Sequence, residues 1–183
     1  LSSGLDNELE IETLSFFGQA RYRLTEKLEL SGGARWNDEQ RTQDPINRVT
    51  GLAPPIRTDR IQSRNISPEM TINYIANDDL TVFASLKQGY KSGSFTIVTL
   101  PREGIPNDFG DEKVQGGEIG VKSRWLDRSL IVNLAAYDYR YKGLQVGASE
   151  PSNNGAPVIT TINAGRARTY GIDLDASYKP RNI

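Results

Sequence analysis

The sequence predicts an all-β protein made of about seven long antiparallel strands in up-and-down order. Three observations support this prediction. Apolar and polar residues alternate with a period of two along most of the chain, the alternating segments are much longer than ordinary strands, and tight turns alternate with long loops. No run of about 18 apolar residues occurs, so we expect no transmembrane helix.

Composition narrows the functional classes. Hydrophobic residues make up 37% of the 183 residues, which is low for a chain that fills a core. The 22 Lys and Arg residues nearly balance the 23 Asp and Glu residues, which argues against a nucleic-acid partner. With no cysteine and no histidine, the chain lacks thiol chemistry and the commonest general base and metal ligand. We therefore expect no enzymatic activity, catalytic residue, cofactor or bound metal.

The first two strands form a hairpin. From Ile11 to Leu24 the apolar residues occupy even positions, and after a short turn the same pattern continues from Leu28 to Asn37. A polar connection from about Thr42 to Asp59 follows. It contains Pro45, which cannot continue a sheet ladder, so we predict a long loop there.

The next hairpin pairs Arg60–Ala76 with a strand that begins at Leu80, and a tight turn joins the two strands. Pro68 lies inside the first of these strands. It predicts either a bulge or a local break in the ladder. A second long loop, rich in proline and glycine, is expected from Lys91 to Gly110.

The third hairpin, within residues 111–146, has the clearest alternation. A strand over Gln115–Trp125 turns at Leu126–Arg128 into a strand that is apolar at even positions as far as Ala136. Beyond that residue charged side chains take the even positions. Either a bulge exchanges the two faces of the strand there, or the strand crosses a bilayer and has left it at that point. A loop from Gly147 to about Ile159 and a last strand, Thr160–Tyr178, complete the pattern.

Strand length and aromatic placement favour a membrane. Strands of about 12 to 18 residues would span roughly 40 to 60 Å at ~3.3 Å per residue, enough to cross a bilayer and project beyond it. Aromatic residues on the apolar face gather at both strand ends, as in interfacial girdles: Tyr22, Tyr74, Trp125 and Tyr178 near the tight turns, and Trp36 and Tyr90 toward the long loops. We expect the following apolar residues to face lipid: Leu14, Leu30, Ile72, Val82, Val121, Leu134 and Leu174.

Several segments resemble the barrel of TonB-dependent outer-membrane receptors. They are FFGQARYRLTEKLELSGGARWNDEQR, SPEMTINYIANDDLTVFASLKQGYKSGSF, GGEIGVKSRWLDRSLIVNLAAYDYRYKGLQV and NAGRARTYGIDLDASY. The resemblance implies a 22-stranded barrel in the bacterial outer membrane, closed by an N-terminal plug domain. It also implies uptake, energised by TonB, of a scarce substrate such as a ferric siderophore.

The chain departs from that family pattern because it shows no plug domain and no TonB box. We therefore expect residues 1–183 to be a partial barrel domain of a longer receptor, with TonB acting through a region that precedes it. Two alternatives remain open on the sequence alone. One is a soluble β-sandwich or small β-barrel that binds a ligand, and the other is a passive porin.

Candidate functional residues lie on the polar faces and in the loops. The polar faces carry Glu29, Arg35, Glu69, Lys87, Glu118, Lys122, Arg124, Asp173 and Asp175, which we interpret as cross-strand charge pairs rather than a substrate path. Asp111 and Glu112 are interpreted as turn formers rather than calcium ligands, and Gly116 and Gly117 as residues that permit sheet curvature. The resemblance implies that loops and the plug contact substrate, so the candidate substrate-facing residues are Arg48, Arg57, Lys91, Arg102, Asn153 and Asn154.

Overall fold

The computed structural model describes residues 5–47, 50–52, 58–96, 106–150 and 157–180. Within these ranges all regular secondary structure is β, which confirms the predicted fold class, and no described helix could span a membrane. Two short strands, β5 (Ser94–Phe95) and β6 (Asp108–Phe109), lie inside the second long loop. The long strands are β1 (Leu5–Arg23), β2 (Leu28–Asn47), β3 (Arg60–Asn77), β4 (Leu80–Lys91), β7 (Glu112–Trp125), β8 (Leu130–Glu150) and β9 (Val158–Tyr178).

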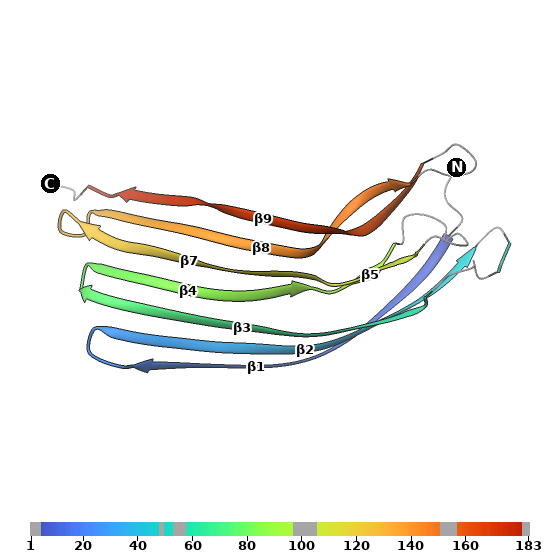
Figure 1. Cartoon of the computed structure of the whole chain (residues 1–183), viewed down its shortest axis with the longest axis horizontal. Helices are drawn as coiled ribbons and strands as arrows, with labels where there is room; N and C mark the ends of the chain where they lie inside the picture. The colour runs from blue at the N-terminus through green and yellow to red at the C-terminus, as the bar shows by residue number, and fades with distance from the viewer. Residues whose placement is uncertain (1–4, 48–49, 53–57, 97–105, 151–156, 181–183) are drawn as a thin grey trace.

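The long strands form one 7-stranded sheet in the order β1-β2-β3-β4-β7-β8-β9, with every neighbouring pair antiparallel. This order follows the sequence, so the predicted up-and-down topology is confirmed. The tight turns lie at one end of the sheet and the long connections at the other (Figure 1). The sheet stays open, with β1 and β9 at its edges. A soluble sandwich or small closed barrel is therefore wrong, because no second layer covers this sheet in the described part of the chain.

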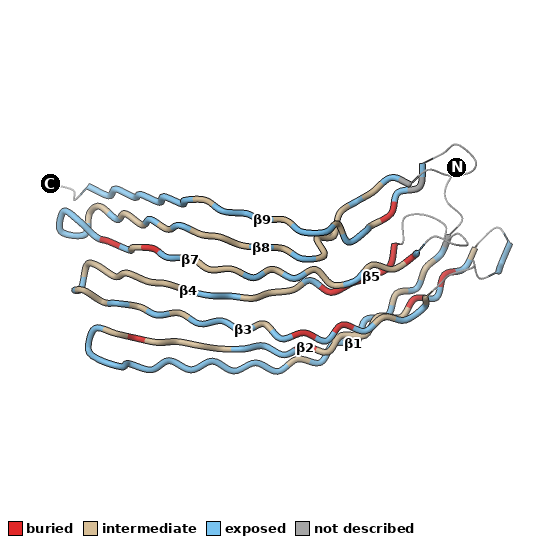
Figure 2. The backbone as a smooth tube through the Cα atoms, in the orientation of Figure 1, coloured by how far each residue is buried: buried red, intermediate tan, exposed pale blue. Residues whose placement is uncertain are grey.

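The strand register sorts the side chains onto two faces. Leu134 lies opposite Val121 on one side and Leu174 on the other, and Ile72 lies opposite Leu30. Every residue expected to face lipid falls on this surface, which we call the apolar face; the opposite surface is the polar face. Among the described residues Phe95 is the only large hydrophobic side chain that is buried. Exposed positions recur along the whole length of the long strands (Figure 2), so the apolar residues face outward rather than into a core.

On the apolar face, hydrophobic residues form a band beside the tight turns. The apolar band comprises Leu14–Tyr22, Leu28–Trp36, Ile66–Tyr74, Leu80–Leu86, Gly117–Trp125, Leu130–Ala136 and Tyr170–Tyr178. Five of these segments have nine residues and two have seven, at or just below the roughly 9 to 11 residues that a tilted strand needs to cross a bilayer. Trp36 stacks on Phe16 at the edge of the band, with ring centroids 5.9 Å apart. Tyr90, expected in the same aromatic row, lies outside the band.

The apolar face becomes polar immediately beyond the band. The register between β7 and β8 runs without a shift from Trp125–Leu130 to Lys113–Lys142. A bulge near Ala136 is therefore excluded, and the two faces of β8 do not exchange there. The alternative, that the strand has left the bilayer, holds instead. Asp138 and Arg140 follow Ala136 on the same face and lie beyond the apolar band.

Strands β2 and β8 extend beyond their predicted ends, so the loop boundaries at Thr42 and Gly147 were wrong. Pro45 lies inside β2 and pairs in register with Asn7 of β1. The backbone N–H of Gln43 points away from β1, donating to the carbonyl of Asp59 at 2.8 Å. Because strand N–H groups alternate in direction, the missing N–H of Pro45 also points away from β1, where β3 no longer pairs with β2.

Pro68 marks a break in the sheet, as predicted, but no bulge. The ladder between β3 and β4 ends at the pair Glu69–Lys87, whereas the register of β2 with β3 passes Pro68 unchanged. The bulge in β3 lies instead between Ile75 and Asn77. From Pro68 toward the long loops, β3 and β4 are joined by side chains. We call this region the β3–β4 seam.

Candidate functional site

The polar face collects the charged residues expected from the sequence. By register, the following residues all lie on it: Glu29, Arg35, Glu69, Lys87, Glu118, Lys122, Arg124, Asp173 and Asp175. In the middle of the sheet Lys87 Nζ lies 3.1 Å from Glu118 Oε1, and Ser85 Oγ donates to the same oxygen at 3.1 Å. Near the tight turns Glu29 pairs with Arg21 at 3.5 Å and with Arg23 at 3.7 Å. These contacts confirm cross-strand charge pairing on this face.

The carboxylates Asp173 and Asp175 lie on the same face of β9. Asn133 Nδ2 donates to Asp175 Oδ1 at 3.3 Å. Within the described ranges no cluster of three or more carboxylate, histidine or cysteine side chains could hold a metal ion. Asp175 therefore belongs to the polar network of the wall.

A shallow hollow of about 500 Å³ lies near the middle of the polar face. It is lined by a mixed set of side chains that includes Phe17, Gln19, Arg35, Glu69, Lys87 and Tyr139. Phe17, which breaks the alternation of β1, is 82% exposed there. The hollow thus presents an aromatic ring, two cations and several hydrogen-bonding groups on the polar face.

Asp111 holds the base of the second long loop across the β3–β4 seam. Its Oδ1 accepts hydrogen bonds from Ser63 Oγ at 2.5 Å and from the backbone N–H of Gly93 at 2.9 Å, and its Oδ2 accepts from Asn65 Nδ2 at 2.6 Å. Burial alone would raise the pKa of this carboxyl. The hydrogen bonds from Asn65, Ser63 and Gly93 outweigh burial and hold the pKa below its ordinary value.

Two amide side chains fix the same loop base from the other side. Gln145 Nε2 lies 3.0 Å from the carbonyl of Ser92 and 3.1 Å from that of Gly110. Asn163 accepts from the backbone N–H of Gly110 at 2.6 Å and donates to its carbonyl at 2.8 Å. Side chains of β3, β8 and β9 thereby form hydrogen bonds with residues at both ends of this loop.

Replacing Asp111 by alanine should loosen this loop base. Three donors lose a charged acceptor, and each such bond contributes roughly 1.5 to 3 kcal/mol, so amide exchange at Gly93 should accelerate about ten- to a hundredfold. Hydrogen exchange read by mass spectrometry on the full-length protein measures this. Asp78→Ala, an exposed carboxylate in a tight turn, is the matched control and should leave exchange at Gly93 unchanged.

The same contacts predict a pH dependence. Because the folded pKa of Asp111 is depressed, its stabilisation is present above the unfolded pKa and is lost as the pH falls through the folded value. Protection at Gly93, corrected for intrinsic exchange, should therefore fall in that acidic range. In Asp111→Ala the same correction should leave no such fall. A fall of equal size in both proteins would contradict the role given to this carboxylate.

Of the six candidate substrate-facing residues, only Lys91 lies in the described ranges. It is the last residue of β4, is exposed, and lies opposite Glu112 at the loop end of the sheet. The other five, Arg48, Arg57, Arg102, Asn153 and Asn154, lie outside the described residues.

The residues that organise the loop base were not predicted from the sequence. Asp111 was interpreted as a turn former, and Gln145 and Asn163 were not singled out. Their partners lie far away in sequence, 48 residues in the case of Ser63 and Asp111. A weak signal was present, because Asp111 follows directly after Gly110 at the point where regular alternation resumes.

Comparisons with known proteins agree with this geometry. A family model described as "TonB dependent receptor-like, beta-barrel" matches residues 2–181. The pesticin receptor of Yersinia enterocolitica is 24% identical over 169 residues, a match that covers 92% of this chain and 24% of the receptor. The ferripyoverdine receptor of Pseudomonas aeruginosa is 29% identical over 174 residues, covering 90% of this chain and 18% of the receptor.

A solved structure shares the fold. The ferric yersiniabactin uptake receptor of Yersinia pestis superimposes with a TM-score of 0.72 at 19% identity, covering 96% of this chain and 25% of that chain. The present chain therefore spans about a quarter or less of the length of these proteins.

Proposed function

Since this chain belongs to the TonB-dependent receptor family, as part of its β-barrel, we propose that the protein takes up a scarce metal complex, in the first place a ferric siderophore, with energy from TonB. The family consists of transport receptors rather than enzymes, and its barrels lie in the bacterial outer membrane, as this chain does. The apolar band is accordingly the lipid-facing surface, and the polar face lines the lumen of the complete barrel.

The arrangement of the loop end carries this proposal. All long connections gather at one end of the sheet (Figure 1), which is the extracellular end in barrels of this kind. Below them, near the middle of the sheet, the hollow around Arg35 and Lys87 forms part of the polar wall that would line the lumen. A ligand captured by the loops would meet this hollow next on its way inward.

The charge at this end suits an iron chelate. Siderophores bind iron through oxygen atoms, and many of the complexes carry negative charge and several hydrogen-bond acceptors. Lys91 lies beside the loops, and Arg48, Arg57 and Arg102 belong to the loop sequences, so we propose that these cations attract the complex. Asn153 and Asn154 would add amide donors. The relatives named for ferripyoverdine and ferric yersiniabactin support this choice of substrate class.

We propose the corresponding domain organisation for the complete protein. Residues 1–183 supply seven strands of a larger barrel, for which 22 strands is the family expectation. A plug domain and a TonB-binding segment would precede this part of the barrel. TonB would act through that region, because energy must reach the lumen from the periplasmic side.

Uptake measurements test the proposal. Cells that produce the full-length protein should accumulate radiolabelled iron supplied as a ferric siderophore, and deletion of TonB should reduce this uptake to the background of cells without the protein. Equal uptake with and without TonB would overturn the receptor assignment. A small hydrophilic solute serves as the control for a passive porin, which would admit that solute whether or not TonB is present.

A further inference from the structure

Above the apolar band, the outward surface of β8 and β9 carries a block of facing cations. Arg140 lies directly opposite Arg168, and Lys142 lies directly opposite Arg166. All four side chains are exposed. Like charges directly opposite each other on one face of a sheet are destabilising, so this arrangement indicates that an anion compensates them.

The described residues supply only part of that compensation. Arg168 is paired with Asp138, with its Nε 2.9 Å from Oδ1 and its second guanidinium nitrogen 2.7 Å from Oδ2. The same guanidinium lies 4.8 Å from the ring centroid of Tyr170 at the edge of the band. No described carboxylate forms an ion pair with Arg140, Lys142 or Arg166, so the block has an excess of positive charge.

The other half of the sheet differs at the same height. On β2 and β3 the outward cation Arg64 pairs with Asp38 at 2.8 Å, and Gln62 donates to the same carboxylate at 2.8 Å. The charge of Arg64 is thus compensated within the protein. On β8 and β9, in contrast, such cations lie side by side, and the exposed Lys113 of β7 also faces Lys142.

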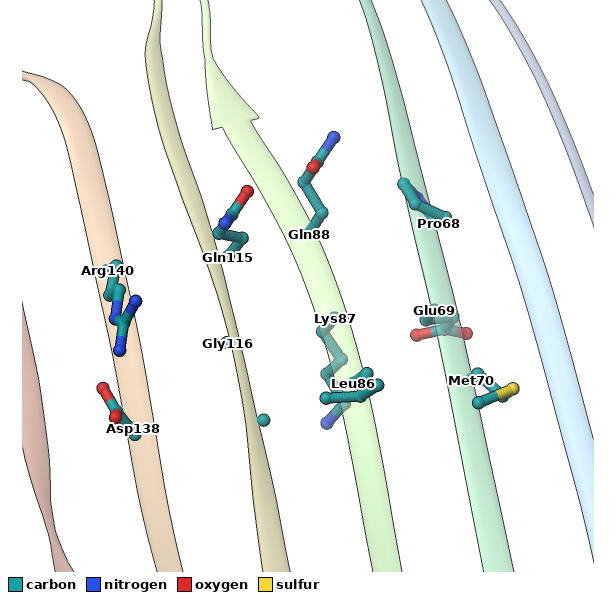
Figure 3. Close-up of a pocket in the computed structure, with 11 residues that line it drawn as sticks. Pro68, Glu69, Met70, Leu86, Lys87, Gln88, Gln115, Gly116, Asp138 and Arg140 are labelled. Carbon is teal, nitrogen blue, oxygen red and sulfur yellow. The ribbon is translucent and has the colours of Figure 1, made fainter.

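A hollow on the lipid-facing surface begins beside this block. Its volume is about 640 Å³, and its lining combines polar and apolar side chains, with the carboxylate of Asp138 at the level of Met70 and Leu86 (Figure 3). Gln88, Gln115 and Arg140 line its upper part, and Met70 and Leu86 its lower part. A second hollow of about 530 Å³ shares Met70 and Leu86 and continues into the band past these residues: Ile72, Ala84, Ile119 and Ala136.

We propose that this surface is a binding site for a lipid of the outer leaflet whose headgroup carries phosphate. The phosphate would lie against Arg140, Lys142 and Arg166, with Gln88 and Gln115 as additional donors, and the acyl chains would follow the hollow into the apolar band. The long loops place this end of the sheet on the extracellular side, so the headgroups at this height belong to the outer leaflet. Cations just outside a hydrophobic band attract anionic headgroups at about the observed position.

The apolar residues that line the two hollows distinguish a lipid from free phosphate. Inorganic phosphate would use only the cations, whereas a lipid gains from both parts of the surface. The site is separate from the lumenal wall, because Arg140 and Lys142 project from the opposite face. Failure of substrate uptake would therefore leave this proposal intact, and the reverse is equally true.

Lipid binding to the purified full-length protein in detergent micelles tests the site. The probes are phosphorylated lipid A, the same lipid stripped of its phosphates, and inorganic phosphate, with bound lipid counted by native mass spectrometry. We expect retention of phosphorylated lipid A and much weaker retention of the stripped lipid. Inorganic phosphate should compete only at far higher concentration than the lipid.

Substitutions locate the site. Arg140→Gln together with Lys142→Gln should weaken binding of phosphorylated lipid A about 25-fold, roughly fivefold for each cation removed. Arg140→Lys should retain most of the binding because it keeps the charge. Arg64→Gln, which removes an outward cation already paired with Asp38, is the matched control and should leave binding unchanged.

Two results would overturn the proposal. One is equal binding of phosphorylated and stripped lipid A to the unaltered protein, a measurement that needs no variant to fold. The other is an effect of Arg64→Gln as large as that of the double substitution, since binding would then depend on overall charge rather than on this surface.

Discussion

Replacing Leu134 by arginine should destabilise the full-length barrel in a bilayer by about 2 to 4 kcal/mol, the cost of placing this cation near the membrane midplane on a lipid-facing strand position. Leu134 lies within the apolar band of β8, between Val121 of β7 and Leu174 of β9 in the register. Its side chain is 47% exposed in the open sheet, so it has no protein core to lose. The expected loss therefore comes from transferring charge into lipid.

The neighbouring position gives the matched control. Asn133 lies on the polar face, where its amide donates to Asp175, and an arginine there can pair with the same carboxylate. Asn133→Arg should change stability by less than about 1 kcal/mol. Denaturant titration of the protein in lipid vesicles measures both variants. Equal losses at the two positions would show that the apolar face does not meet lipid.

The sequence alone was sufficient to identify the two faces of most long strands, although it left the faces of β8 beyond Ala136 open. Alternation has a period of two, so one correct assignment, such as Leu30, fixes the face of its whole strand unless a bulge intervenes. The apolar residues that register places together had been grouped from alternation alone. The average hydropathy of these strands is too low to indicate a membrane. The family resemblance was therefore needed to interpret the apolar face as the lipid-facing one.

Strand ends could not be read in the same way. The sequence predicts a loop from about Thr42 that contains Pro45, yet β2 continues past this proline because its missing N–H points to the side without a partner. Whether β2 has a partner on that side depends on where β3 begins to pair, which is at Arg60. This is set by the tertiary structure and not by the local sequence. The short strands β5 and β6 were missed for a related reason, since two residues are too few to show alternation.

The loop base was the least predictable part. Asp111 acts through Ser63, Asn65 and Gly93, and two of these partners precede it in sequence by slightly more than a quarter of the chain. A carboxylate beside a glycine is typical of many turns, and no local pattern separates those from a residue that joins two strands. The break at Pro68 was visible in the sequence, but the side chains that bridge it were not.

Gly116→Ala should severely disrupt assembly of the barrel, although it adds only one methyl group. A Cβ atom at this position would lie 2.1 Å from the carbonyl oxygen of Asp138 and 2.7 Å from the Cα of Tyr139. Both are backbone atoms of β8, so they cannot rotate away, and β7 and β8 would have to separate locally. The sequence had suggested sheet curvature as the reason for this glycine, and the structure gives a more specific one, which is the close approach of two strands.

The expected size of this effect follows from what must move. Overpacking usually costs about 1 to 3 kcal/mol, and a clash with backbone belongs at or above the upper end of that range. Gly32→Ala is the control, because its Cβ would lie 3.6 Å from the Glu69 carbonyl, an ordinary contact, and it should be neutral or slightly stabilising. Folding yield in vesicles, read from the heat-modifiable shift of the folded barrel on gels, compares the two. Gly116→Ala that folds as well as Gly32→Ala would mean that β7 and β8 do not approach this closely.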